Sequence, residues 1–217
     1  MQYADVRLLA LALSSLALPV GHSVDGRGLR AVVLGRPSAA RPLLVVGCIH
    51  GTEPAGLAIV RALVRSGALP GTTIVVVRAL NPDGCYRLGT RGNAHGVDLN
   101  RNFPTGARPL TEPESRWFVR LVRAVRPAVT VVFHQHEDVV RAWGQSVPAA
   151  RRFARLLGGA LPYRSERWPP GSISNWQNHA FPGTASFVVE LPAGPVRRAL
   201  VPRYVRALQL LARPPAR

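Results

Sequence analysis

Four short apolar segments, separated from one another by stretches of helical or turn character, constrain the fold of this chain more than any other feature. They are rich in valine, isoleucine and leucine, and they lie at residues 42–48, 72–80, 128–136 and 184–191. Strands that are apolar on both faces are typical of a sheet that helices cover from both sides. The pattern therefore predicts an α/β protein.

Helical periodicity occupies the intervals between these strands. It predicts helices over residues 53–65, 113–124, 149–157 and 196–211, and Pro54 and Pro113 stand in first turns, where proline is favoured. A further strand is expected at 30–35, and loops are expected at 85–110 and 162–180. This order favours one domain with a mixed, largely parallel sheet and helices on both faces.

Residues 1–20 stand apart from the rest of the chain. Residues 7–19 have the length and apolarity of a signal-peptide core and are too short to span a membrane. However, Asp5 precedes this run and no clear small-residue cleavage site follows it. The sequence supports two interpretations of this segment equally, a cleaved signal peptide and an N-terminal helix packed on the domain. A secreted and a cytoplasmic location are therefore equally open. Residues 21–217 are expected to form the folded domain.

The formal net charge of +17 comes from arginine alone, since none of the 28 basic residues is lysine. Clustered cations would indicate a nucleic-acid partner, but these arginines are spread along the chain and no recognition module accompanies them. We therefore expect no nucleic-acid partner and no stable membrane insertion. The charge favours solubility and the attraction of acidic substrates.

The chain has two cysteines, Cys48 and Cys85, which are too few for a disulfide scaffold. Both stand where a predicted strand gives way to a loop, so that one bridge between them is compatible with the pattern. A buried, unpaired cysteine at each place is the commoner arrangement.

Polar side chains gather where the apolar strands end. His50 follows the first of these strands, His134 ends the third, Glu190 ends the fourth, and Asn100 and Arg101 lie in the long loop. The carboxyl ends of parallel strands meet at one edge of a sheet, where ligands bind in folds of this class. Glu190 also interrupts an apolar run, in which an unpaired carboxylate is costly to bury. We therefore expect a functional site at this edge.

Five motifs in order carry a resemblance to a known family. They are HGTEPAG from His50, NPDG from Asn81, TRGNAHGVDLNRNFP from Thr90, the strand that ends in His134, and FVVELPAG from Phe187. His-x-x-Glu alone is a weak signal. Together the motifs resemble the M14 zinc carboxypeptidases, and most closely their bacterial branch of murein-peptide amidases and γ-D-glutamyl-diaminopimelate peptidases. The segment 21–27 is also similar to that branch, and the resemblance implies that residues 21–217 form a zinc peptidase catalytic domain.

The resemblance implies a metal centre and its catalytic groups. One Zn²⁺ would be held by His50, Glu53 and His134, with water in an open fourth position, as in catalytic zinc sites. Glu190 would act as the base that takes a proton from this water. Arg91 would stabilise the oxyanion that develops in the transition state.

It also implies residues that bind the substrate. Asn100 and Arg101 would hold a substrate carboxylate, for which the planar guanidinium group is suited. Ser172 and Trp176 belong to a G-S-x-x-x-W pattern that looks like the amidase branch, and they are further substrate-binding candidates. Asp98 would either orient a neighbouring side chain or shape a turn.

Two assignments stay open. His136 is an alternative to His134 as a metal ligand, or else a pocket residue. Classical family members supply a tyrosine from the loop that precedes the catalytic glutamate, whereas no tyrosine lies between Tyr163 and Glu190. Either Tyr163 reaches the site or the closure over the substrate differs.

The expected function is hydrolysis of an amide bond next to a free carboxylate in a small peptide. A cell-wall peptide with a diaminopimelate-like end is implied by the resemblance alone. The alternative is an N-acyl amino acid deacylase of the succinylglutamate desuccinylase and aspartoacylase type, which shares His-x-x-Glu and a later histidine. A non-catalytic binding module on the same fold is a lesser alternative, because the metal ligands and the base are all present.

Overall fold

The computed structural model describes residues 18–36, 41–106 and 110–214. In these residues a seven-stranded mixed sheet has the order β3-β5-β4-β6-β9-β7-β8. Strands β5, β4, β6 and β9 are parallel, β3 and β7 run antiparallel to their neighbours β5 and β9, and β8 is parallel to β7. The strands are β3 (Ala31–Gly35), β4 (Leu43–Val46), β5 (Thr73–Val77), β6 (Val129–Gln135), β7 (Val139–Ala142), β8 (Tyr163–Ser165) and β9 (Ala185–Leu191).

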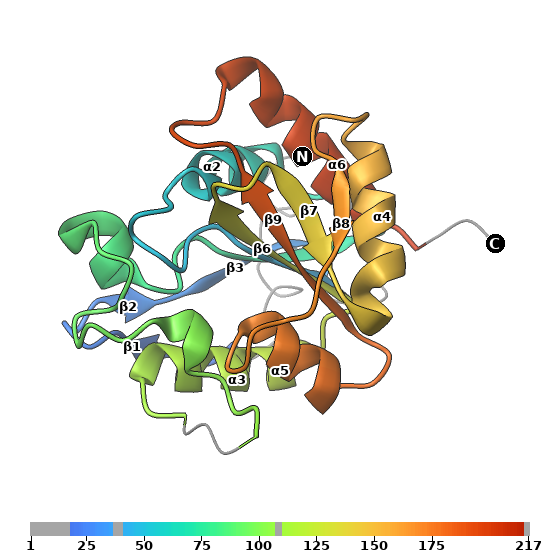
Figure 1. The fold of residues 1–217 in the computed structure, drawn as a ribbon. Helices are drawn as coiled ribbons and strands as arrows, with labels where there is room; N and C mark the ends of the chain where they lie inside the picture. Colours follow the sequence, from blue (N-terminus) through green and yellow to red (C-terminus); the bar gives the residue numbers. More distant parts are fainter. Residues whose placement is uncertain (1–17, 37–40, 107–109, 215–217) are drawn as a thin grey trace, which may run out of the picture.

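Helices cover both faces of this sheet (Figure 1). Helices α2, α4 and α6 pack on one face and on one another, whereas α3 and α5 lie on the other face. Strands β4, β5 and β9 are therefore buried along their whole length, which explains their apolar composition. The predicted fold class is confirmed. The helices are α2 (Gly56–Ser66), α3 (Pro113–Val125), α4 (Val147–Leu156), α5 (Ile173–Ala180) and α6 (Val201–Leu211).

Smaller elements complete the chain. Strands β1 (Gly21–His22) and β2 (Gly28–Leu29) form a separate antiparallel pair. Short helical turns are η2 (Gly84–Leu88), η3 (Leu99–Arg101), η4 (Gly144–Ser146) and η5 (Arg198–Leu200). None of the helices in the described ranges is both long enough and apolar enough to cross a bilayer.

The expectation of a loop over residues 162–180 was wrong, because this stretch contains β8 and α5. Helix α5 is short and rich in polar residues of modest helix propensity, and contacts from distant parts of the chain support it. The Ile173 N–H donates to Asn100 Oδ1 at 3.0 Å. The Asn178 side chain bonds both the N–H and the carbonyl of Ser186, at 2.8 and 2.9 Å. Strand β7 was also missed, and η2 and η3 lie at the start and in the middle of the expected loop 85–110.

Cys48 and Cys85 form a disulfide, with their Cα atoms 6.5 Å apart, so the commoner unpaired arrangement does not apply. The bridge ties the end of β4 to η2. The apolar run at 7–19 falls outside the described residues except for its last two positions, so the choice between a signal peptide and a packed helix stays open.

Candidate metal centre and active site

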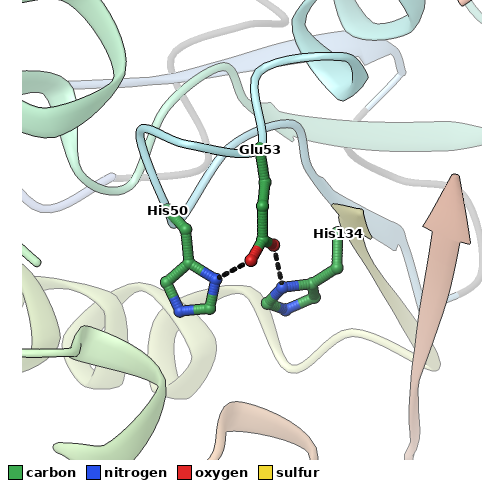
Figure 2. A group of neighbouring side chains, drawn as sticks. All are labelled: His50, Glu53 and His134. Atoms are coloured by element: carbon green, nitrogen blue, oxygen red, sulfur yellow. Dashed lines mark hydrogen bonds and ion pairs between the residues drawn. The ribbon is translucent and has the colours of Figure 1, made fainter. Parts of the chain in front are cut away.

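Three predicted metal ligands converge at the carboxyl edge of the sheet (Figure 2). His134 lies near the end of β6, and His50 and Glu53 come from the loop between β4 and α2. His50 Nδ1 lies 2.9 Å from Glu53 Oε1, and His134 Nδ1 lies 2.8 Å from Glu53 Oε2. The ligand atoms all lie within 4.8 Å of one another, and the side chains are buried. Two imidazoles and one carboxylate are a donor set typical of catalytic zinc.

His50 Nδ1 supports the fit of a metal ion to this group. This buried nitrogen has no hydrogen-bond partner of good geometry among the described residues, although Glu53 is near. A buried polar atom without a partner is unusual in a folded protein. It is expected where the nitrogen's lone pair serves as a metal ligand.

Asp98 fixes the orientation of His50 from behind. Its Oδ1 lies 2.9 Å from His50 Nε2 and accepts the Asn100 N–H at 2.8 Å. Its Oδ2 accepts a hydrogen bond from Arg91 Nε at 3.0 Å. A carboxylate on the far nitrogen of a ligand histidine sets the ring's tautomer and direction. Asp98 therefore joins the metal group to Arg91.

Burial and hydrogen bonds set the protonation of the three candidate ligands. Burial alone would lower the pKa of His50, but the nearby carboxylates of Asp98 and Glu53 outweigh burial and raise that pKa. Burial opposes the ionisation of Glu53, yet the hydrogen bond from His134 and the nearby His50 ring hold its pKa well below the usual range. Desolvation dominates at His134 and lowers its pKa. An ionised Glu53 and a His134 with a lowered pKa are both suited to bind a cation, because metal ligands must be deprotonated.

Glu190 has the properties of a general base. It pairs in register with His134 across strands β6 and β9. Burial, followed by the negative charge of Glu53, raises the pKa of Glu190 to about 7, while Arg141 and His50 oppose this shift. Its Oε2 atom is buried and has no hydrogen-bond partner in the described ranges. A carboxyl that titrates near neutrality beside a metal group is suited to proton transfer.

Arg91 is held at the metal group by two carboxylates. Its Nη1 donates to Glu53 Oε1 at 2.9 Å, in addition to the bond from its Nε to Asp98. The NPDG turn fixes the segment that carries it, because Asn81 Nδ2 donates to the Gly92 carbonyl at 2.9 Å. Gly51 allows this turn to approach, since a Cβ there would lie 2.2 Å from the Gly84 oxygen.

Asn100 and Arg101 also reach the site. Asn100 Nδ2 lies 3.4 Å from His134 Nε2, and Arg101 Nη1 donates to the Asn100 carbonyl at 2.8 Å. The segment ahead of α5 packs closely on them, because Gly171 has a φ of +79° and a Cβ there would lie 2.3 Å from the Arg101 oxygen. Both residues line the same cavity as the metal group.

This cavity has a volume of about 170 Å³. Its size suits the groups around one scissile bond. The predicted residues that line it are His50, Glu53, Arg91, Asn100, Arg101, His134, Ser172 and Glu190. The rest of the lining was not among the predicted site residues and consists of Gln135, Glu137, Arg141, Trp168, Pro169 and Val188. The only signal for Glu137 and Arg141 was the placement of charges among apolar residues directly after β6.

Three sequence candidates lie elsewhere. Trp176 was expected to bind substrate, but its ring is buried in the core, stacked on Phe103 with ring centroids 5.5 Å apart. His136 follows the end of β6, is exposed, and is not part of the metal group found in the described residues. Tyr163 lies in β8 under Arg151 and is not a lining residue of the cavity.

A larger cavity of about 770 Å³ lies at the opposite, amino-terminal edge of the sheet. It is lined by the first residues of β4, β6 and β9 together with the end of α6. Its described lining includes no histidine, cysteine or acid. The smaller cavity, which contains the metal group and Glu190, is therefore the candidate active site.

Comparison with known proteins agrees with this geometry. The sequence profile of the zinc carboxypeptidase family matches residues 13–116. Murein peptide amidase A of Escherichia coli K12 is 33% identical over 192 residues, which cover 74% of this chain and 77% of the relative. This chain belongs to the M14 zinc carboxypeptidase family. It is accordingly a zinc-dependent hydrolase.

Other amidases and carboxypeptidases are similar over most of the chain. Murein peptide amidase A of Vibrio campbellii is 29% identical over 208 residues, covering 79% of this chain and 77% of the relative. The crystal structure of a murein-tripeptide amidase from Escherichia coli O157 superposes with a TM-score of 0.73 at 27% identity, over 92% of this chain and 94% of that one. A metallo-carboxypeptidase from Burkholderia cenocepacia has a TM-score of 0.71 at 20% identity, covering 97% and 68% of the two chains, and shares the fold.

Proposed function

We propose that this M14 protein is a peptide amidase that removes the terminal residue of a small cell-wall peptide of the murein-tripeptide kind. The observation that carries the proposal is the small cavity that is lined by the metal group, by Glu190 and by three arginines. The similarity of this chain to murein peptide amidases favours a small cell-wall peptide over a long protein chain as the substrate. A cavity of about 170 Å³ also favours a short peptide.

His50, Glu53 and His134 would hold the zinc ion. Bound there, zinc supplies Lewis acidity that polarises the scissile carbonyl and lowers the pKa of a water molecule. The protein's own contribution begins with Asp98, which keeps His50 Nδ1 directed at the ion by holding the opposite ring nitrogen at 2.9 Å.

Glu190 would move the protons in this reaction. Its carboxylate takes a proton from the attacking water, and the resulting carboxylic acid returns that proton to the leaving nitrogen. Because burial raises its pKa to about 7, both forms are accessible near neutral pH. Arg91, fixed by Glu53 and Asp98, donates to the carbonyl oxygen as negative charge develops there.

Asn100 and Arg101 would position the substrate by its free carboxylate. Arg101 uses one N–H on the Asn100 carbonyl and keeps other donors for a ligand. Asn100 accepts the Ile173 N–H through Oδ1 and directs its amide nitrogen toward His134. Anchoring the carboxylate here would place the neighbouring amide bond beside the metal group. Binding energy is thereby used to orient the scissile bond for attack. Ser172 caps α5 through its Oγ, which accepts the Asn175 N–H at 3.2 Å, and it forms the cavity wall.

A panel of substrates tests the proposal. The zinc-loaded protein is incubated with murein tripeptide, C-terminal dipeptides, γ-glutamyl dipeptides and N-acyl amino acids, and released amino acids are quantified by mass spectrometry. Murein tripeptide should give the highest kcat/KM, and its C-terminally amidated form should be cleaved poorly. Preferred cleavage of N-acyl amino acids would instead identify a deacylase. Stoichiometric zinc without any hydrolysis would support a binding module.

A further inference from the structure

The three helices on one face of the sheet carry positive charge and no acid. They are α2, α4 and α6, and α6 packs on both of the others (Figure 1). Their arginines are Arg61, Arg65, Arg151, Arg152, Arg155, Arg203 and Arg206, and all but the half-buried Arg152 are exposed. The fold therefore gathers arginines that are distant in sequence onto one face, which we call the basic face.

The larger cavity of about 770 Å³ adjoins the basic face at the amino edge of the sheet. It lies between the start of α4 and the end of α6, and its walls are mainly apolar, with Leu43 and Leu211 among them. Its volume is within the range of about 300–1,000 Å³ that is typical of ligand sites. Three arginines, Arg41, Arg152 and Arg213, also line it. The cavity is thus an apolar space bordered by cations.

No carboxylate pairs with these three arginines in the described ranges. Arg41 donates to three backbone carbonyls, including that of Gly183 at 3.0 Å. Arg152 donates to the carbonyls of Arg213 and Leu210, at 2.8 and 2.9 Å. A carbonyl fixes a guanidinium group in place but leaves its full charge, and the group keeps further N–H donors.

Positive charge accumulates around the cavity. Burial, and then the charge of the neighbouring Arg155, lowers the pKa of Arg152. Arg65 lies in the last turn of α2, and the Gln209 side chain of α6 donates to the Gly67 carbonyl at 2.8 Å, so that the ends of α2 and α6 adjoin. An anion bound at the cavity would supply the counter-charge that the described lining lacks.

An occupant has to match both parts of this site. A nucleic acid would neutralise the arginines but would leave the apolar walls in contact with water. A neutral apolar molecule would fill the cavity without compensating the charge. An acyl chain that ends in an anionic headgroup does both, and apolar patches with a polar rim are typical of sites that contact proteins or membranes. Proteins bind at membrane surfaces through this combination of buried apolar area and attraction to anionic lipids.

We propose that the amino edge of the sheet docks on a membrane surface that contains anionic phospholipid. One acyl chain occupies the larger cavity, and its phosphate lies at Arg41, Arg152 and Arg213. Arg65 and its neighbours on the basic face meet the headgroups of adjacent lipids. The metal group lies at the opposite, carboxyl edge, so that docking leaves the candidate active site open to soluble peptides. This peripheral binding goes beyond the proposed function and does not depend on it.

Vesicle binding by the full chain tests the electrostatic part. The protein is sedimented with vesicles of phosphatidylcholine alone and with vesicles that contain about one third phosphatidylglycerol, at low and at high salt. Only the anionic vesicles should bind, and high salt should weaken the binding. Arg65→Gln and Arg213→Gln should each weaken it about fivefold. Arg123→Gln makes the same change of charge at an exposed position of α3 on the other face and should bind as the parent does.

A soluble lipid tests the cavity itself. Lysophosphatidylglycerol below its micelle concentration and glycerophosphoglycerol, which has the same headgroup without the chain, are titrated by calorimetry. Only the lysolipid should bind. Ala212→Phe places a ring in the cavity and should weaken both the lysolipid and the anionic vesicles about tenfold or more. Ala124→Phe, at an exposed position of α3, is the matched control and should have no effect.

Melting temperatures from circular dichroism identify the variants that remain folded. If Ala212→Phe is unfolded, the comparison of the two soluble ligands and the surface variant Arg213→Gln decide the outcome. Hydrolysis of murein tripeptide in solution should be unchanged in Arg213→Gln, because the catalytic groups lie at the other edge.

Three results would overturn the inference and leave the proposed function intact. The first is binding to neither the anionic vesicles nor the lysolipid. The second is equal binding to double-stranded DNA and to anionic vesicles with no effect of Ala212→Phe, which would identify a surface for polyanions in general. The third is binding of the lysolipid monomer without any binding to vesicles, which would exclude membrane docking. Conversely, vesicle binding without hydrolysis of any peptide would support the docking site while the proposed function fails.

Discussion

Glu190 acquires its chemical character from its surroundings. An exposed glutamate would be ionised at neutral pH and would be a weak base. At the end of β9, burial and the nearby Glu53 carboxylate raise its pKa to about 7. Arg141 and His50 limit the rise. The same side chain is therefore a stronger base than its residue type implies.

Replacing Glu190 by glutamine should abolish turnover without loss of zinc. The amide keeps the shape of the side chain but cannot accept the proton, and general-base catalysis contributes about 10²–10⁴-fold to such reactions. We expect kcat to fall by about that factor while the zinc content measured by mass spectrometry is unchanged. Asp138→Asn is the matched control, since Asp138 is exposed and its positive φ of 54° suits asparagine. Normal kcat in Glu190→Gln would remove this residue from the mechanism.

The dependence of kcat/KM on pH should report the same group. Glu190 works as a base only when ionised, so activity should be lost as the pH falls through its pKa. That pKa is raised from 4.5 to about 7, and the positive charge of a bound zinc ion lowers it again. The acidic limb should therefore lie between these two values. A profile that is flat across this interval would contradict the assignment, and Glu190→Gln should lack the limb.

Arg101→Ala should impair the cleavage of peptides with a free terminal carboxylate more than the cleavage of amidated peptides. A hydrogen bond to a charged group contributes about 1.5–3 kcal/mol, which corresponds to about 10- to 150-fold. We expect kcat/KM for the free-acid peptide to fall by this factor and that for the amidated peptide to change little. Equal losses on the two substrates would rule out a carboxylate clamp.

Local elements hold the metal loop in place. The HGTE loop between β4 and α2 packs against the NPDG turn, and the Cys48–Cys85 disulfide joins the two. Asp83 of the NPDG turn accepts a hydrogen bond from the Ser23 hydroxyl at 2.9 Å and so anchors the segment near β1. Motifs that are far apart in the sequence are thereby linked into one support for His50 and Arg91.

Removing the disulfide should destabilise the protein and loosen the metal loop. The bridged cysteines are 37 residues apart, and closing a loop of that length stabilises a fold by about 3–4 kcal/mol. The double variant Cys48→Ala/Cys85→Ala should lose about this much in urea unfolding and should bind zinc more weakly, because Cys48 is two residues from His50. A reducing agent should reproduce the loss in the parent and have no effect on the double variant. Unchanged stability in both cases would show that the bridge contributes nothing.

Across the whole molecule, the candidate active site and the larger apolar cavity lie at opposite edges of the sheet. Its carboxyl edge holds the metal group and the small polar cavity, whereas its amino edge holds the larger apolar cavity. The candidate ligands come from the loop after β4 and from β6, two segments about 80 residues apart, as shown by the contact between His134 and Glu53 with a separation of 81. A bound ion therefore links parts of the fold that the chain itself connects only remotely.

Zinc should consequently stabilise the folded state as well as enable catalysis. A ligand that binds only the native form contributes about 2.7 kcal/mol at a concentration one hundred times its Kd. Chelation should lower Tm and abolish hydrolysis, and added zinc should restore both. In His134→Gln the melting temperature should no longer respond to zinc at that concentration. Activity and Tm that are both indifferent to a chelator would contradict the metal site.

Much of the architecture was predictable because its signals are local. The buried strands and the long helices follow from hydrophobic periodicity, and the structure confirms the mixed sheet with helices on both faces. Strand β7 and helix α5 were missed because they are short and depend on partners such as Glu190 and Asn100. Trp176 was assigned to the substrate by its motif, whereas packing on Phe103 places it in the core.

The order of apolar and polar residues by itself determined that this chain builds a helix-covered sheet with histidines and acids at its carboxyl edge. Only the tertiary structure decided that Glu190 is a buried carboxyl with a raised pKa, that Cys48 and Cys85 pair, and that Arg141 of the cavity wall pairs with Glu166. The physical reason is that periodicity acts between residues near in sequence. Desolvation, ion pairing and disulfide formation depend instead on distances in space, which are set when remote segments pack together.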